Sequence, residues 1–344
     1  MKGIHGGDIY RNHVKLDFSV NINPLGIPDA VEAALYEAVK ISNRYPDISA
    51  EKLKIAVSEM LTVSKEQLLF GSGASELFMA IMHGIKPRKT VIPIPSFYGY
   101  EYAAGVTDEE IIFFETKEKE GFCLQEDFFS VLSEEVDVLF LANPNNPTGN
   151  LMSRERLRTL LSHCREKSIY VVLDECFIEF TGKEYSMIQE INNFPNLILV
   201  RAFTKIFSIP GVRLGYLLCS NPLLLKKIGR QLPEWNVSSF AQAAGYECAM
   251  QTAFAEKTVT YVEKERQFLE DGLNQAGFKV FPSRANFLLI YCEQPLYDRL
   301  LEKGILIRNC ENFRGLSKGF YRIAVKSRKE NETLLKAIGE IKWN

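Results

Sequence analysis

The chain has 344 residues, of which 46% are hydrophobic and 24% are charged, as in an ordinary globular protein of about two domains. The formal net charge of −2 gives no electrostatic support to a nucleic-acid or membrane-surface role. No apolar run reaches the ~18 residues of a membrane span, and the first residues lack the apolar core of a signal peptide. The seven cysteines are scattered without metal-ligand spacing, so we expect reduced thiols, no metal site and a cytoplasmic location.

The beginning of the chain is rich in Gly, Asn and Pro. We expect an ordered arm over 1–28, rather than a helix or a sheet strand. On composition alone, His5 and Asn23 in this arm fit turn capping better than ligand binding. Helical periodicity then predicts a helix over 29–42 with an Asp cap, and a second over 49–61 capped by a serine.

A glycine-rich turn, 71–76, lies between a predicted strand at 67–70 and a predicted helix. Free backbone N–H groups and the positive end of a helix make such a turn a possible phosphate cradle. A plain serine-capped helix explains the turn equally well. The turn is neither GxGxxG nor a Walker loop, which disfavours a dinucleotide or ATP as the ligand.

Two predicted strands end in segments that suit a flat ligand. The aromatic segment 96–100 follows the strand 90–95, and its rings can either stack on a cofactor or fill the core. The strand 136–142 ends in NPNNPTG. We expect the two Asn-Pro steps to keep this loop rigid and extended, so that Asn146 points at a fixed position beyond the strand.

Two further strands are followed by charged residues. Asp174 follows the strand 169–173 and can pair with a pyridinium nitrogen, although a helix cap or a surface acid is the alternative. Lys205 follows the strand 196–200, and burial or nearby positive charge would lower its pKa and leave a nucleophilic amine. Arg213 can bind a phosphate in bidentate fashion. This pair suits pyridoxal phosphate, but a solvated lysine and an ion-paired arginine fit this stretch alone equally well.

The alternation of strands and helices predicts an α/β fold, with a mostly parallel sheet flanked by helices and its polar residues at one edge. We place this large domain at 29–235 and a smaller α+β domain at 236–344. The remaining elements are helices at 153–167, 221–231, 238–274, 295–303 and 328–342, and strands from 279, over 285–291 and over 319–325. Arg322 lies in the last strand among apolar neighbours, where it is costly unless it binds an anion. We interpret it as a substrate anchor, with an internal ion pair as the alternative.

Taken together, these motifs resemble the fold-type I pyridoxal-phosphate enzymes of the aspartate aminotransferase superfamily, from the arm to about residue 328. The resemblance rests on NPNNPTG, Asp174-Glu175, and Lys205 with Arg213. Within the superfamily the chain is similar to the branch of histidinol-phosphate aminotransferases and threonine-phosphate decarboxylases, through RYPD and SRANF. Several local strings are more similar to the decarboxylases; they lie at 5–7, 17–26, 204–216 and 306–316.

This resemblance implies that pyridoxal 5'-phosphate is held covalently at Lys205. Asp174 would pair with the ring nitrogen, Asn146 with the ring hydroxyl oxygen, and Phe97 would stack on the ring. The residues implied at the cofactor phosphate are Ala74, Ser75, Thr204, Arg213 and, from the neighbouring subunit of a homodimer, Tyr45. The residues implied at the anionic groups of a small phosphorylated substrate are Arg322 at one group and His5, Asn23 and Arg308 near the other.

Two positions depart from the family pattern. Phe177 stands where aminotransferases often have a tyrosine, so the ring hydroxyl would lose one hydrogen bond. Ala202 stands where a phosphate-binding hydroxyl is common, which leaves the phosphate more dependent on Ser75 and Thr204. The resemblance implies decarboxylation of L-threonine O-3-phosphate to (R)-1-amino-2-propanol O-2-phosphate, in cobalamin synthesis. The alternatives are a histidinol-phosphate aminotransferase of histidine synthesis and, in a different class, an inactive cofactor-binding regulatory protein.

Overall fold

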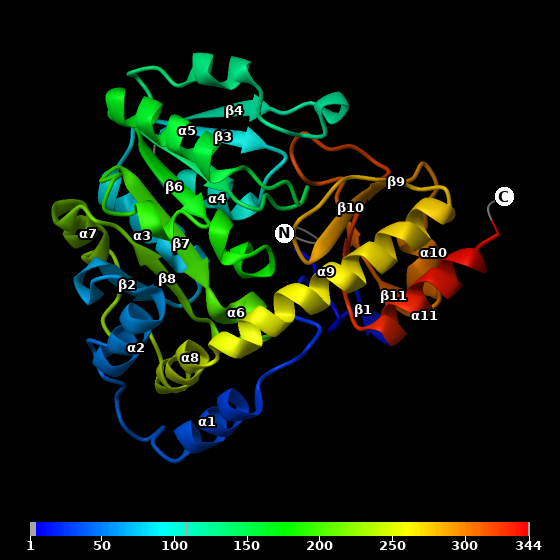
Figure 1. Ribbon diagram of the computed structural model, residues 1–344, viewed down its shortest axis with the longest axis horizontal. Helices are drawn as coiled ribbons and strands as arrows, with labels where there is room; N and C mark the ends of the chain where they lie inside the picture. Colours follow the sequence, from blue (N-terminus) through cyan, green and yellow to red (C-terminus); the bar gives the residue numbers. More distant parts are fainter. Residues whose placement is uncertain (1–4, 108, 343–344) are drawn as a thin grey trace.

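A seven-stranded sheet lies at the centre of the larger unit of the computed structural model (Figure 1). The structure describes residues 5–107 and 109–342. The strand order is β2-β8-β7-β6-β5-β3-β4. All strands run parallel except β8, which is antiparallel to both of its neighbours. The strands are β2 (Leu68–Gly71), β3 (Lys89–Ile94), β4 (Glu110–Glu115), β5 (Val138–Ala142), β6 (Tyr170–Asp174), β7 (Leu197–Ala202) and β8 (Gly215–Leu218). The predicted mostly parallel sheet is confirmed, although β4 and β8 were not predicted.

Helices cover both faces of this sheet. In β6, Val172 packs in one apolar core with side chains of α3 (Ala74–Ile85), α4 (Tyr98–Ala104) and α7 (Pro222–Gly229). Its neighbours Val171 and Leu173 point to the opposite core, because successive side chains of a strand alternate between faces. That core contains α2 (Glu51–Leu61), α5 (Arg154–Glu166), α8 (Ser239–Met250) and α9 (Thr252–Gln275). The chain is therefore a three-layer α/β structure.

A smaller antiparallel sheet in the order β12-β13-β10-β9 lies to the right of the main sheet in Figure 1, and α9 runs from the helices of the larger unit toward it. Its strands are β9 (Lys279–Val280), β10 (Phe287–Tyr291), β12 (Arg308–Asn309) and β13 (Phe320–Ala324), accompanied by α10 (Leu296–Glu302) and α11 (Arg328–Gly339). The predicted smaller α+β unit is confirmed, and its boundary at residue 236 stays a prediction. Within the described ranges, no helix is long and apolar enough to cross a membrane.

Short 3₁₀ helices connect several of these elements. They are Lys65–Gln67, Glu118–Glu120, Glu126–Val131, Ile178–Phe180, Lys183–Tyr185, Ile188–Glu190 and Pro210–Val212.

The amino-terminal arm was predicted to contain no strand, and this was wrong. Its β1 (Leu16–Asp17) pairs in parallel with β11 (Ile305–Leu306), and the next amide, of Phe18, donates to Leu306 O at 2.7 Å. A two-residue strand has no alternation that a sequence pattern could reveal. The pairing fixes the arm against the small sheet, which brings its glycine-rich beginning toward the cavity described below.

Three helix predictions need correction. The helix expected from 29 to 42 is shorter, α1 (Asp29–Val39), and Pro28 rather than an aspartate is its N-cap. The serine cap expected for α2 is absent: Asp47 Oδ2 accepts from the amide of Glu51 at 2.8 Å. The long helix expected over 238–274 is broken between α8 and α9 at Gln251, whose φ of −94° and ψ of 45° are not helical. Propensity alone does not locate such a break.

Candidate active site

A cavity of about 770 Å³ lies at the carboxyl edge of the main sheet, where it faces the small sheet. The strands β3, β5, β6 and β7 all end at this edge, so the residues after them converge there. The cavity wall contains eleven of the predicted site residues: His5, Ala74, Ser75, Phe97, Asn146, Asp174, Thr204, Lys205, Arg213, Arg308 and Arg322.

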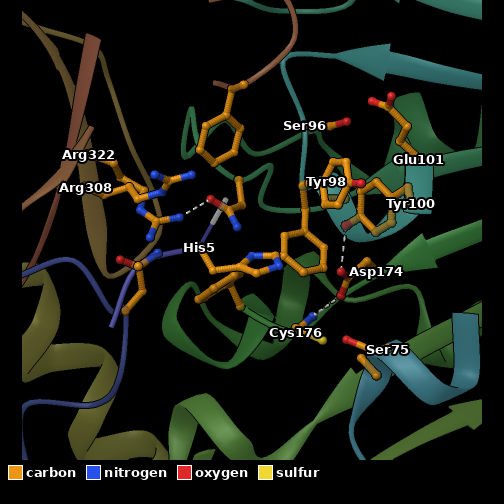
Figure 2. Close-up of a pocket in the computed structure, with 18 of the residues that line it drawn as sticks. His5, Ser75, Ser96, Tyr98, Tyr100, Glu101, Asp174, Cys176, Arg308 and Arg322 are labelled. Atoms are coloured by element: carbon orange, nitrogen blue, oxygen red, sulfur yellow. Dashed lines mark hydrogen bonds between the residues drawn. The ribbon is translucent and has the colours of Figure 1, made fainter. Parts of the chain in front are cut away.

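Asp174 is the last residue of β6 and its carboxylate is held by two donors. The hydroxyl of Tyr100 donates to Oδ2 at 2.6 Å, and the amide of Cys176 donates to Oδ1 at 2.9 Å (Figure 2). Burial raises the pKa of Asp174, whereas the hydrogen bonds from Cys176 and Tyr100 lower it. A buried carboxylate with fixed orientation can therefore face a cationic ring nitrogen in the cavity.

Lys205 lies on α6 (Phe203–Ile206), the single helical turn directly after β7. Burial lowers the pKa of Lys205, and the positive charges of Arg322 and Arg213 lower it further. Both effects favour the neutral amine, which is the nucleophilic form of a lysine.

An anion cradle is built at the start of α3, where Gly73 is the N-cap residue with a φ of 82°. A Cβ at Gly73 would lie 2.5 Å from Nη2 of Arg213, so only glycine lets the guanidinium approach this helix end. Ser75 and Thr204 line the cavity beside it. Helix amides, an arginine and two hydroxyl residues together form a site for a phosphate group.

The small sheet contributes a pair of buried arginines on the opposite wall (Figure 2). Arg308 on β12 and Arg322 on β13 are direct cross-strand partners. Arg322 donates to Ser19 O at 2.8 Å and to Asn146 Oδ1, and its Nε finds no partner in the described part of the chain. Burial lowers the pKa of Arg322 to about 10, and it also lowers the pKa of Arg308. Two buried like charges at adjacent positions are unfavourable unless an anion binds between them.

Asn146 is oriented by the same arginine. Because a guanidinium only donates hydrogen bonds, the atom of Asn146 that faces Arg322 must be the amide oxygen. The amide nitrogen is then the atom that can donate to a ligand. The loop itself is tied down by Asn145, whose Nδ2 donates to Pro95 O at 3.0 Å.

The imidazole of His5 lies near Arg308 and Arg322 (Figure 2), and its ring centroid is 5.9 Å from that of Phe97. Burial lowers the pKa of His5, and the charges of Arg308, Lys205 and Arg322 add to the effect. These effects disfavour the protonated imidazole in the free site, and an anion bound nearby would reverse part of the shift.

Two predicted site residues lie outside the cavity wall. Asn23 donates through Nδ2 to Ile206 O at 2.7 Å and to Thr258 Oγ1 at 2.8 Å, which is a structural role. Tyr45 has 82% of its surface exposed and packs on Trp235, with ring centroids 5.0 Å apart.

The wall residues that were not predicted include Asn21, Tyr100 and Asn312. Asn21 is buried, and its Oδ1 finds no hydrogen-bond partner among the described residues. It lies two positions before the asparagine that was chosen, in the same Asn-rich stretch, and the sequence pattern does not say which of the two faces the cavity. Tyr100 belongs to the aromatic segment that was noted, but its bond to Asp174 joins parts of the chain that are far apart in sequence.

The two departures from the family pattern both lie at the cavity. Phe177 lines the wall, with its ring 5.1 Å from that of Phe287 in an edge-to-face arrangement. Ala202, at the end of β7, also lines the wall. Neither side chain can supply a hydroxyl group to a ligand.

The residues present fit pyridoxal 5'-phosphate. The wall offers a lysine amine with a lowered pKa, a fixed carboxylate, an amide nitrogen, a flat aromatic ring and a phosphate cradle that a Cβ at Gly73 would fill. These are the groups that a pyridine aldehyde with a phosphate tail requires.

The family model for class I and II aminotransferases matches residues 13–338. The chain belongs to this family. A threonine-phosphate decarboxylase of Salmonella typhimurium is 36% identical over an alignment of 330 residues that covers 95% of this chain and 91% of that protein. A histidinol-phosphate aminotransferase of Clostridium kluyveri is 32% identical over an alignment of 338 residues that covers 95% of this chain and 94% of that protein.

Among solved structures, the histidinol-phosphate aminotransferase from Clostridium acetobutylicum is similar, with a TM-score of 0.88 and 34% identity over 94% of this chain and 98% of that one. The cofactor of this aminotransferase-family chain is pyridoxal 5'-phosphate. The protein is a pyridoxal-phosphate-dependent enzyme, a threonine-phosphate decarboxylase or an aminotransferase. The regulatory-protein alternative is therefore set aside.

Proposed function

We propose that the enzyme decarboxylates L-threonine O-3-phosphate to (R)-1-amino-2-propanol O-2-phosphate, a step of cobalamin synthesis. The observation that carries this proposal is the cross-strand pair of buried arginines, Arg308 and Arg322. The substrate has a carboxylate on its α-carbon and a phosphate on the next carbon. Two anionic groups so close together match two cations on neighbouring strands. The 36% identity to the Salmonella decarboxylase supports the same assignment.

We assign the residues of the cavity as follows. Lys205 holds the cofactor, Asp174 faces its ring nitrogen, Asn146 donates to its ring oxygen and Phe97 covers its ring. The phosphate cradle consists of Ala74, Ser75, Thr204 and Arg213. Arg322 and Arg308 bind the two substrate anions, together with His5. Asn21, which lines the cavity, takes the place of Asn23 as the asparagine of the arm that faces the substrate.

The bound cofactor supplies a protonated pyridine ring that accepts an electron pair from a bond to the substrate's α-carbon. Asp174 contributes by keeping its charge next to the ring nitrogen. Which bond breaks depends on how the anion anchors orient the substrate, and placement within a fraction of an ångström matters. Arg322 holds the carboxylate that leaves as CO₂. Lys205 in its protonated, ammonium form would then give a proton to the α-carbon and become the neutral amine.

The second candidate is a histidinol-phosphate aminotransferase. It is favoured by the similarity to the enzymes of that name from Clostridium kluyveri and Clostridium acetobutylicum. In that reaction Lys205 would remove the α-proton of the substrate instead of returning one after CO₂ has left. Phe177 disfavours this candidate because it cannot donate a hydrogen bond to the ring oxygen.

The paired activity assay tests the proposal. Purified holoenzyme is given L-threonine O-3-phosphate while CO₂ is measured, and separately histidinol phosphate with 2-oxoglutarate while glutamate is measured. We expect CO₂ release and no glutamate. Lys205→Ala should lose the activity together with the borohydride-reducible adduct of the cofactor. Glutamate formation without CO₂ release would overturn the decarboxylase assignment, and a reducible adduct in Lys205→Ala would overturn the role of that lysine.

We further propose that the enzyme works as a homodimer in the cytoplasm, with Tyr45 completing the phosphate site of the neighbouring subunit. Tyr45 packs on Trp235, and both are exposed. Other large exposed apolar residues near Tyr45 in the sequence are Tyr36, Val39, Ile41 and Ile48. Exposed apolar side chains of this kind are typical of interfaces. The seven free cysteines fit a reducing compartment. Mixing inactive Tyr45→Ala and Lys205→Ala enzymes under subunit exchange should restore part of the activity, whereas no recovery would count against a shared site.

A further inference from the structure

A segment of the small sheet reaches across the cavity to the main sheet. Residues 311–316, which we call the strap, connect β12 to β13, and all six line the cavity. At Gly315 the φ is 84°, and a Cβ would lie 3.4 Å from Ile94 Cδ1 and from Pro95 N at the end of β3. The strap therefore closes the space between the two sheets by direct contact.

An ion pair fastens the strap to the main sheet. Arg314 donates to Glu101 on α4, with Nη2–Oε1 at 2.7 Å and Nε–Oε2 at 3.2 Å. Its guanidinium also lies 4.2 Å from the ring centroid of Phe113 on β4. The geometry is bidentate and stacked, which gives a defined closed position.

The same ion pair is weak enough to open. The Arg314 side chain is 50% exposed and that of Glu101 is 29% exposed. Pairs exposed to this degree contribute little to stability and are screened by salt. Such a contact fixes a segment without locking it, as expected where a substrate must enter and a product must leave.

The strap is also connected to a substrate anchor. Asn312 accepts a hydrogen bond from Arg308 Nη2 at 2.7 Å. Arg308 in turn donates to Asn309 O at 2.7 Å and is the cross-strand partner of Arg322. A displacement of the strap would therefore change the direction in which the Arg308 guanidinium points.

We propose that the Arg314–Glu101 pair is a latch that holds the strap closed, and that the closed strap positions Arg308 for the anionic substrate. This inference rests on the proposed function in so far as Arg308 binds a substrate anion. Arg314 and Glu101 are positioning residues, since they act through Asn312 and Arg308. Opening the latch should weaken substrate binding without disturbing the cofactor.

The kinetic test uses holoenzyme with Arg314→Met, which keeps an apolar stem on Phe113 and removes the charge. Its KM for the substrate that the wild type turns over should rise about fivefold, the upper range for an exposed ion pair, with kcat within about twofold. Wild-type KM should rise with added salt more steeply than that of Arg314→Met. The charge-swapped double variant, Glu101→Arg with Arg314→Glu, should recover most of the wild-type KM.

A matched control is Lys279→Met. Lys279 pairs with Glu118 at 2.6 Å and likewise joins the small sheet to the larger unit, but neither residue lines the cavity. This variant should keep the wild-type KM. An unchanged KM in Arg314→Met, or an equal rise in Lys279→Met, would overturn the latch.

Hydrogen exchange of the holoenzyme separates this inference from the proposed function. The amides of Phe313 and Leu316 donate to Cys310 O and Phe313 O within the strap region, so both should exchange slowly in the wild type. In Arg314→Met they should exchange several-fold faster, whereas Lys279→Met should leave them unchanged. If the wild type turned over neither candidate substrate, the proposed function would fail, but the exchange rates would still show whether the Arg314–Glu101 pair holds the strap closed. Exchange in Arg314→Met at the wild-type rates would overturn the latch.

Discussion

Tyr100 donates its phenolic hydrogen to Oδ2 of Asp174 at 2.6 Å, and both side chains are buried. The ring of Tyr100 is itself fixed by stacking on Phe140, with centroids 5.2 Å apart and an interplanar angle of 15°. The bond joins α4, which follows Phe97, to the carboxyl end of β6. Phe97, whose side chain lines the cavity, and the carboxylate of Asp174, which faces the cavity, are therefore held in one rigid arrangement.

Tyr100→Phe tests this relationship. Loss of a hydrogen bond to a charged group raises the pKa of Asp174 and weakens its hold on a cationic ring nitrogen. We expect kcat/KM to fall about tenfold, which corresponds to about 1.4 kcal/mol, together with a shift in the pH dependence of cofactor absorbance. Tyr102→Phe on the same helix, where the side chain is 52% exposed, should behave as wild type. Equal effects in the two variants would contradict a role through Asp174.

Asn21 and Asn23 should differ in what they affect. Asn21→Ala removes an unpartnered group from the cavity wall, so KM should rise while the melting temperature stays the same. Asn23→Ala leaves Ile206 O without its donor, which should lower stability by about 1–3 kcal/mol and change KM little. Thermal melts and steady-state kinetics of the two variants decide the matter, and the opposite pattern would restore Asn23 as the ligand.

The pH dependence of substrate binding should report on His5. Burial and three nearby cations lower its pKa in the free enzyme, and a bound anion raises it again. Between these two pKa values each binding event takes up a proton, so affinity increases as the pH falls through that window. As the pH falls through this window, KM of the wild type should fall relative to that of His5→Gln. The difference should reach about tenfold if the free and bound pKa values of His5 differ by one. Parallel KM profiles for the two enzymes would exclude this coupling.

Glu109 should make stability depend on pH far from the cavity. Burial raises the pKa of its carboxyl group from 4.5 to about 7, although the hydrogen bond donated by Thr90 Oγ1 acts to lower this pKa. The folded state then binds more protons than the unfolded chain between these values, so stability falls as the pH rises through this range. Because the group is partly hydrated, we expect Glu109→Gln to gain only about 1 kcal/mol at about pH 8 and nothing near pH 4. Melts at both pH values check this, with the exposed Glu115→Gln as control; a gain at the lower pH alone would contradict it.

The larger fold was predictable because buried parallel strands are continuous apolar runs and each is followed by a loop with distinctive residues. Asp174 and Lys205 stand directly after such runs, so their convergence follows from the parallel order of β6 and β7. The strand β8 was missed because its four residues, which follow a turn, show no alternation of apolar and polar residues. The pairing of β1 with β11 was missed because two residues carry no periodicity.

The parts of the site that were missed depend on contacts between distant segments. Asn21 and Asn23 have the same side chain and lie two positions apart, and the hydrogen bonds of Asn23 to Ile206 and Thr258 decide which of the two faces the cavity. The Tyr100 bond to Asp174 and the Arg314 bond to Glu101 likewise bring distant elements together. Arg322 could be identified from the sequence because an arginine in an apolar strand is costly to bury unless its charge is compensated. Its pairing with Arg308 could not be predicted, because it depends on the register between β12 and β13.

The most direct measurement of the central claim is the fate of the carboxyl carbon of L-threonine O-3-phosphate. The substrate is labelled with ¹³C at that carbon and incubated with the holoenzyme, with and without 2-oxoglutarate. If the proposed decarboxylation is correct, we expect one labelled CO₂ for each 1-amino-2-propanol phosphate formed, at a rate that does not depend on 2-oxoglutarate. Label retained in a 2-oxo acid, with glutamate formed in equal amount, would contradict it.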